Sequence, residues 1–174
     1  MLATGNISSL FLTGADEPLT YSLSSDTSGL QALSSGGVAV AYSVSGNTLT
    51  AYRSGGNPAT AADQVFIFSL TSGTGAYSFT LIDQLDHASL DTQSGDNLEN
   101  DLLIQLGSIL RATDRDGDAV TYVPSGNPNG LVITVDDDTP TQTLALVSDT
   151  VDEDGVIENA TSGTQTGDGI AGGV

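Results

Sequence analysis

The sequence is constrained most by short segments in which apolar and polar residues alternate. The clearest segment covers residues 76–82, where Tyr77, Phe79 and Leu81 are separated by residues that carry hydroxyl groups. Residues 131–135 repeat the pattern, with apolar side chains at every second position. A period of two places alternate side chains on opposite faces of a strand, so both segments are predicted to be strands with one buried face.

Other segments extend the strand prediction along the chain. Residues 65–68 are continuously apolar, as expected for a strand covered on both faces. Segment 101–113 contains a stretch that resembles a helix, but Gly107 interrupts it, so a strand is predicted there too. Further strands are predicted near residues 6–12, 18–24, 37–44, 47–53, 119–123 and 142–148. About ten short strands with frequent turns predict an all-β fold, an immunoglobulin-like antiparallel β-sandwich.

Negative charge is the second constraint. The chain carries 22 Asp and Glu against three cations, all of them arginines, so its formal net charge is -19. Self-repulsion of this kind destabilises a compact state, and few arginines are available to relieve it. Bound divalent cations are the natural counter-charge, and the hard oxygens of Asp favour calcium. Asp outnumbers Glu, which favours loop sites, because the short side chain hydrogen-bonds the backbone of its own turn.

The same composition excludes several classes of function. Nucleic-acid binding needs Lys and Arg to displace counterions from phosphates, so no nucleic-acid partner is expected. Anionic membrane surfaces disfavour an acidic chain, and the sequence has no apolar run long enough to span a bilayer, so no direct membrane insertion is expected. The chain contains no cysteine, which excludes disulfides and thiolate metal sites.

An enzyme is not expected. His87 is the only histidine, so it cannot serve a multi-histidine metal site, and a structural hydrogen-bonding role is predicted for it. The sequence has no Gly-x-Ser-x-Gly elbow to support a hydrolytic triad. A pair of carboxylates for glycoside hydrolysis is still open from the sequence, although the chain lacks tryptophan for a sugar cleft. Most of the tyrosines are predicted to be half-buried strand residues.

The first of three acidic clusters carries the clearest metal-binding pattern. Asp114, Asp116 and Asp118 are spaced two apart, so their carboxylates can converge on one cation, and Gly117 permits a tight backbone. The segment is not an EF-hand loop, because its glycine is misplaced and its twelfth position is Ser125 rather than Glu. We therefore predict a calcium loop of another type, with a solvated acidic turn as the alternative.

The other two clusters are runs of adjacent carboxylates, which repel one another unless they are neutralised. For each run, a plain charged linker is as good an interpretation as a cation site. Together with the first cluster, they indicate calcium at a domain end and at a junction, where an ion would stiffen a chain of domains. The runs are Asp136, Asp137 and Asp138 before Thr139-Pro140, and Asp152, Glu153 and Asp154 at the start of a Gly-rich tail.

A looser acidic set lies in or near a long predicted connection between strands. It is interpreted either as a further ion site or as a solvated loop, with the solvated loop preferred. The set comprises Asp83, Asp86, Asp91, Asp96, Glu99, Asn100 and Asp101.

Five stretches, taken in order, carry a family resemblance. They are residues 75–87, Glu99 to Leu102, Ala112 to Asp118, Val135 to Pro140 and Val151 to Gly155. In this order they resemble the long tandem repeats of type I-secreted RTX adhesins. The likeness spans at least residues 60–156, and the first 55 residues fit it less distinctively.

The resemblance implies an immunoglobulin-like domain with calcium at the repeat ends, secreted to the bacterial cell surface. The implied function is that of a structural extender or scaffold module, which supports cell adhesion and biofilm formation beside neighbouring repeats of the same adhesin. The alternative is a ligand-binding or split domain, which grips a host or cell-surface glycan or protein, or presents a module that does so.

The resemblance also sets the predicted domain boundaries. Residues 1–140 are expected to form the sandwich repeat, and residues 141–174 a linker and the opening segment of a repeat. Because residue 1 falls inside a repeat, the chain is out of phase with the family unit and is expected to be a piece of a longer protein. The tail then opens the next repeat or supplies a first strand to this sandwich, in cis or to a neighbour. A domain split by an inserted ligand-binding module is the third alternative.

Overall fold

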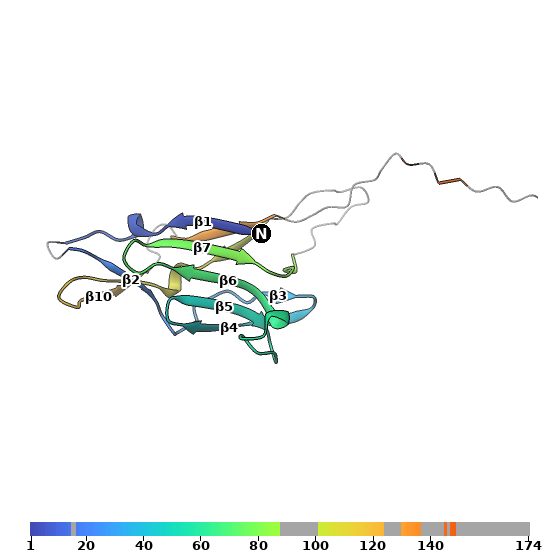
Figure 1. The fold of residues 1–174 in the computed structure, drawn as a ribbon, viewed down its shortest axis with the longest axis horizontal. Helices are drawn as coiled ribbons and strands as arrows, with labels where there is room; N and C mark the ends of the chain where they lie inside the picture. The colour runs from blue at the N-terminus through green and yellow to red at the C-terminus, as the bar shows by residue number, and fades with distance from the viewer. Residues whose placement is uncertain (15–16, 88–100, 124–129, 137–144, 146, 149–174) are drawn as a thin grey trace, which may run out of the picture. The chain divides into compact units, whose positions relative to one another are not determined.

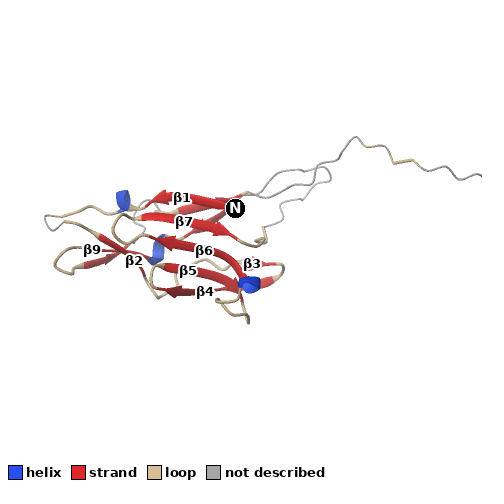
Figure 2. Ribbon diagram, viewed as in Figure 1, coloured by secondary structure: helices blue, strands red, loops and turns tan. Residues whose placement is uncertain are grey.

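The computed structural model describes residues 1–14, 17–87, 101–123, 130–136, 145 and 147–148. Met1–Thr139 forms one compact unit and Pro140–Val174 a second. The first unit consists of short strands with three single-turn 3₁₀ helices (Figure 1, Figure 2). Its elements are β1 (Leu2–Asn6), η1 (Ser8–Leu10), β2 (Thr20–Leu23), β3 (Ser34–Ser35), β4 (Val38–Ser45), β5 (Thr48–Arg53), η2 (Ala61–Asp63), β6 (Gln64–Leu70), β7 (Ala76–Leu81), β8 (Leu102–Gln105), η3 (Gly107–Ile109), β9 (Leu110–Thr113), β10 (Ala119–Thr121) and β11 (Val132–Val135).

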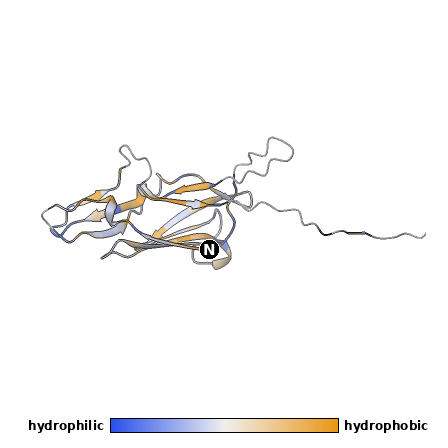
Figure 3. Cartoon of the chain, turned by 90° about the horizontal axis from the view of Figure 1, so that it is seen from above, coloured by the Kyte–Doolittle hydropathy of each residue, from blue (hydrophilic) through white to orange (hydrophobic). Residues whose placement is uncertain are grey.

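The strands form an antiparallel β-sandwich, which confirms the predicted fold class. One layer is a six-stranded sheet with the order β1-β7-β6-β5-β4-β3. The other layer is built from a three-stranded sheet, β10-β9-β2, and a two-stranded sheet, β11-β8. The paired strands of the described residues are all antiparallel. In Figure 3 the most apolar residues lie on strands of both layers.

The core lies between the two layers and is rich in Phe, Leu and Ile. Phe66 and Phe68 on β6 are completely buried, and the ring of Phe66 lies 4.9 Å from that of Phe79 on β7. The opposite layer contributes Ile104 from β8 and Leu110 from β9, which are also buried. Side chains from both layers thus belong to one continuous apolar cluster. Within the described part of the chain, no helix has the length and apolar character that a bilayer crossing requires.

A β-bulge explains the continuous apolar run on β6. Ala51 is paired with Phe66, and the next residue of β5, Tyr52, is paired with Gln64. Val65 is therefore the extra residue of the bulge, and its carbonyl accepts the N–H groups of Ile82 and Asp83. The bulge lets Val65 and Phe66 both be completely buried although they are adjacent in sequence.

Most predicted strands agree with the structure, and two differ from it. The strand predicted at 6–12 is wrong: β1 covers Leu2–Asn6, and the Asn6 side chain accepts the N–H of Ser8 at 2.7 Å, where η1 begins. The strand predicted at 101–113 is divided into β8 and β9 by η3. This turn carries the chain from pairing with β11 to pairing with β2. The strand predicted at 142–148 falls largely outside the described residues.

The sandwich has two distinct ends. β1 begins and β11 ends at the same end of the sandwich, which we call the entry end (Figure 1). The β9–β10 turn lies at the other end, which we call the distal end (Figure 1).

The central position of Phe66 generates the first prediction. We expect Phe66→Ala to lower the free energy of unfolding by about 3–5 kcal/mol, because it removes a buried ring and leaves a cavity. Leu103→Ala on β8 is the matched control, since Leu103 is 48% exposed and should change stability by less than about 1 kcal/mol. Urea unfolding followed by circular dichroism measures both. Equal losses for the two variants would contradict the assigned core.

Candidate metal centre

The acidic turn, Asp114–Asp118, joins β9 to β10 at the distal end. The Asp114 carboxylate accepts the backbone N–H of Gly117 at 3.1 Å and of Asp118 at 2.8 Å. The Asp114 N–H donates in turn to the Asp118 carbonyl at 3.0 Å. Gly117 has a φ of 105°, a conformation that residues with a Cβ rarely adopt. The short Asp side chain and the glycine together close this hairpin.

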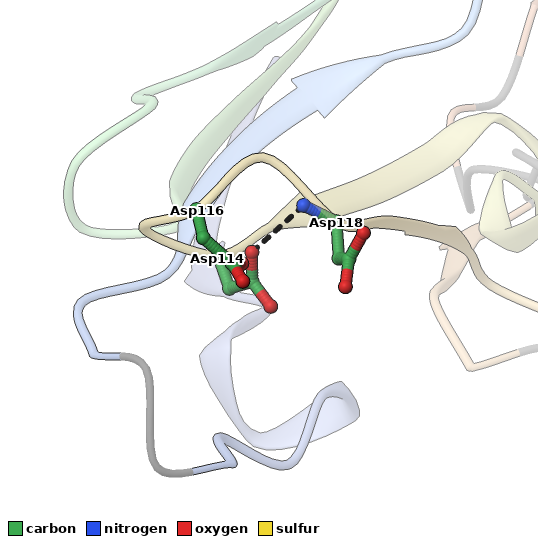
Figure 4. Close-up of side chains that lie close together, drawn as sticks. All are labelled: Asp114, Asp116 and Asp118. Atoms are coloured by element: carbon green, nitrogen blue, oxygen red, sulfur yellow. Dashed lines mark hydrogen bonds between the residues drawn. The ribbon is translucent and has the colours of Figure 1, made fainter.

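The predicted convergence of three carboxylates is present in this turn. Asp114, Asp116 and Asp118 each offer an oxygen atom, and these oxygens all lie within 4.8 Å of one another. Figure 4 shows the three side chains on the same side of the turn. All three are at least partly exposed, so a cation from solvent can reach them.

The proximity of these carboxylates changes their protonation. A hydrogen bond from the Asp116 carboxyl lowers the pKa of Asp114, and the N–H groups of Asp118 and Gly117 lower it further. The pKa of Asp116 is raised, because its proton is held by that hydrogen bond and because Asp114 and Asp118 repel a second negative charge. Without a metal ion, the three carboxylates therefore oppose one another's negative charge.

The donor set fits a hard divalent cation. Calcium binds oxygen at 2.3–2.6 Å, so two oxygens on opposite sides of one ion lie about 5 Å apart. Three oxygens within 4.8 Å of one another meet this limit. Oxygen-only ligation favours calcium or magnesium over the transition metals that prefer nitrogen and sulfur. Calcium takes six to eight ligands, so backbone carbonyls or water would complete the shell.

The other predicted metal ligands are not part of this cluster. Asp136 follows β11 at the entry end and is exposed. Asp137, Asp138, Asp152, Glu153 and Asp154 lie outside the described residues. Metal binding at the second and third clusters therefore stays a prediction.

The looser acidic set includes two carboxylates with structural contacts. Asp83 forms an ion pair with Arg53. The two oxygens of Asp86 accept the N–H groups of Gly36 and Gly37, each at 2.8 Å. Asp101 is exposed, and Asp91, Asp96, Glu99 and Asn100 lie outside the described residues. The carboxylates of Asp83 and Asp86 thus form contacts within the domain.

Sequence reasoning missed two features that the structure reveals. The Asp86 contacts hold the turn between β3 and β4, and the Gly36-Gly37 pair was the available signal, since adjacent positive φ angles of 58° and 76° require glycine. An apolar groove beside the acidic turn was also missed. Its signal was Phe11-Leu12, which the prediction assigned to a strand.

Comparison with family models, with curated proteins and with solved structures found no match to this chain.

Asp86 generates the second prediction. The N–H groups of Gly37 and Gly36, the Ser34 hydroxyl and the charge of His87 lower its pKa from the ordinary value of 3.8. The stability that these contacts contribute is therefore present above the ordinary pKa and is lost as pH falls through the lowered value. We expect Asp86→Asn to lower Tm by about 2–5 °C at pH 7, because an amide offers only one acceptor oxygen.

Thermal unfolding from pH 7 to pH 2 tests this expectation. The difference in Tm between the parent chain and Asp86→Asn should shrink toward the acid end, where the carboxylate of the parent is protonated as well. The exposed Asp101→Asn is the control and should follow the parent at every pH. A Tm difference that does not depend on pH would show that Asp86 acts through something other than its charge.

Proposed function

We propose that the chain is a calcium-stabilised structural module of a large secreted bacterial surface adhesin. The observation that carries the proposal is the convergence of Asp114, Asp116 and Asp118 within 4.8 Å, in a chain with 22 acidic residues and three cations. One calcium ion would neutralise most of the charge of these three carboxylates. Since the turn links β9 to β10, the ion would also hold these two strands together.

The remaining parts of the proposal come from the family resemblance. They are the role of extender or scaffold beside neighbouring repeats, secretion to the cell surface, and support of cell adhesion and biofilm formation. Calcium-dependent folding is compatible with secretion, because a chain kept unfolded by low calcium inside the cell would fold outside it. In this proposal the chain performs no catalysis.

A second candidate function is a ligand-binding or split domain of the same kind of adhesin. The observation that favours it is the apolar groove beside the acidic turn, where Leu12 and Val120 are exposed and can contact a ligand.

Calcium dependence of stability is the third prediction. We expect calcium at about a hundredfold excess over its dissociation constant to raise Tm by roughly 5–10 °C, because an ion that binds only the native state stabilises it by mass action. Differential scanning calorimetry in millimolar calcium and in chelator measures the shift. An equal Tm in calcium and in chelator would contradict the proposal.

The variant Asp116→Asn separates the turn from other possible calcium sites. The amide removes one negative charge from a turn in which Asp114 and Asp118 repel the charge of Asp116, so in chelator the Tm of the variant should equal or exceed that of the parent. In calcium the variant should lose most of the stabilisation, since one ligand charge is gone. Asp101→Asn removes a charge outside the turn and should keep the full calcium response. If Asp116→Asn keeps the full increase of Tm in calcium, the ion binds at another acidic cluster.

A further inference from the structure

An apolar groove opens at the distal end beside the acidic turn. It has a volume of about 660 Å³ and lies between the segment after η1 and the inner face of β9 and β10. Phe11 and Tyr122, whose rings contact each other with centroids 6.1 Å apart, line it beside Leu12 and Val120. Leu12 is 97% exposed and Val120 57% exposed. Apolar residues gathered at one concave site on an otherwise acidic protein indicate a contact surface.

One wall of the groove is an outer strand with backbone groups that have no partner among the described residues. β10 is the outermost strand of its sheet. The carbonyl of Asp118 and the N–H of Tyr122 are bonded toward β9. Bonding directions alternate along an antiparallel strand, so the N–H and C=O groups of Ala119 and Thr121 point away from β9. An extended peptide can pair with such an edge and place alternate side chains on the groove side.

The charge around the groove selects the occupant. Asp114 and Asp118 line it, and Figure 4 shows their carboxylates on the same side of the turn. A second copy of this chain, with a net charge of -19, would be repelled. Residues 140–174 carry acidic but no basic residues, so the tail is equally unsuited. The occupant that complements both the apolar walls and the carboxylates is apolar and basic.

We propose that the distal end binds an extended basic segment of a partner protein. Its backbone pairs with the outer edge of β10, and its alternate apolar side chains enter the groove between Phe11 and Val120. A Lys or Arg next to the apolar stretch contacts Asp118 and Asp114. This proposal goes beyond the calcium site and does not depend on it, because the apolar walls and the strand edge contain none of the three candidate ligands. Calcium at the turn would weaken only the charged contact.

Three synthetic peptides test the proposal on the full chain. The first is a blocked nine-residue peptide that alternates valine with threonine and ends in two lysines. The second replaces the lysines with glutamates, and the third carries N-methyl groups on alternate amides, which block strand pairing. Backbone NMR shifts and calorimetry measure binding in 2 mM chelator and again in 2 mM calcium, so a chain that needs calcium to fold still gives an answer.

We expect the lysine peptide to bind and to shift the amide signals of Ala119 and Thr121. In chelator the glutamate peptide should bind at least about tenfold more weakly, because attraction becomes repulsion. The N-methylated peptide should lose most of its affinity. Val120→Asp should weaken binding at least about tenfold in both buffers, by placing a charge in the apolar groove. Leu103→Asp, an equal change at an exposed apolar residue outside the groove, should not.

Several outcomes would overturn the proposal. They are the absence of binding at millimolar peptide, equal affinity for the lysine and glutamate peptides in chelator, and equal binding to the Val120→Asp and Leu103→Asp variants. Concentration-dependent dimerisation that Val120→Asp abolishes would assign the groove to a second copy instead. If the chain binds the lysine peptide but its Tm does not rise in calcium, this inference stands and the proposed calcium site is wrong.

Discussion

The shortage of positive charge is the constraint on which the loops of this sandwich depend. With three arginines against 22 acidic residues, most carboxylates cannot form ion pairs, and the structure satisfies several of them with backbone N–H groups. Asp26 accepts from Ser28, Asp63 from Asn57, Asp86 from Gly36 and Gly37, and Asp114 from Gly117 and Asp118. Asp26 and Asp114 reach N–H groups of their own turns, a local contact that the short Asp side chain favours, and this gives a physical reason for the excess of Asp over Glu.

The acidic turn is where backbone donors no longer suffice. Asp114 accepts two N–H groups of the turn, whereas the pKa of Asp116 is raised by its hydrogen bond with Asp114 and by the negative charge of Asp114. A third carboxylate, Asp118, adds to the repulsion. This arrangement differs from the Asp86 contacts, in which one carboxylate meets two donors. A cation is the counter-charge that fits the first arrangement, and the second needs none.

The alternation pattern was sufficient for most of the fold, because period two directly reports which side chains face the core. It failed where a single residue redirects the chain. Asn6 ends β1 through a side-chain bond to the Ser8 N–H, and the 3₁₀ turn at Gly107 moves the strand to a new partner. The spacing of the acidic turn predicted its convergence, because all three side chains belong to one local hairpin. Phe11-Leu12 signalled only one part of the groove, because the groove joins the segment after η1 to β10, more than a hundred residues later.

The same charge excess explains how the protein tolerates its exposed edges. Outer strands such as β1, which is exposed along its whole length, and β10 usually carry lysine or proline that prevents pairing between molecules. This chain contains no lysine, and neither strand contains proline. Repulsion between copies that each carry a charge of -19 can provide the protection instead. Protection of this kind acts only against acidic molecules. The β10 edge and the groove therefore stay open to a basic molecule. Salt or calcium screens the charge, and so weakens both the protection against other copies and the preference for a basic partner.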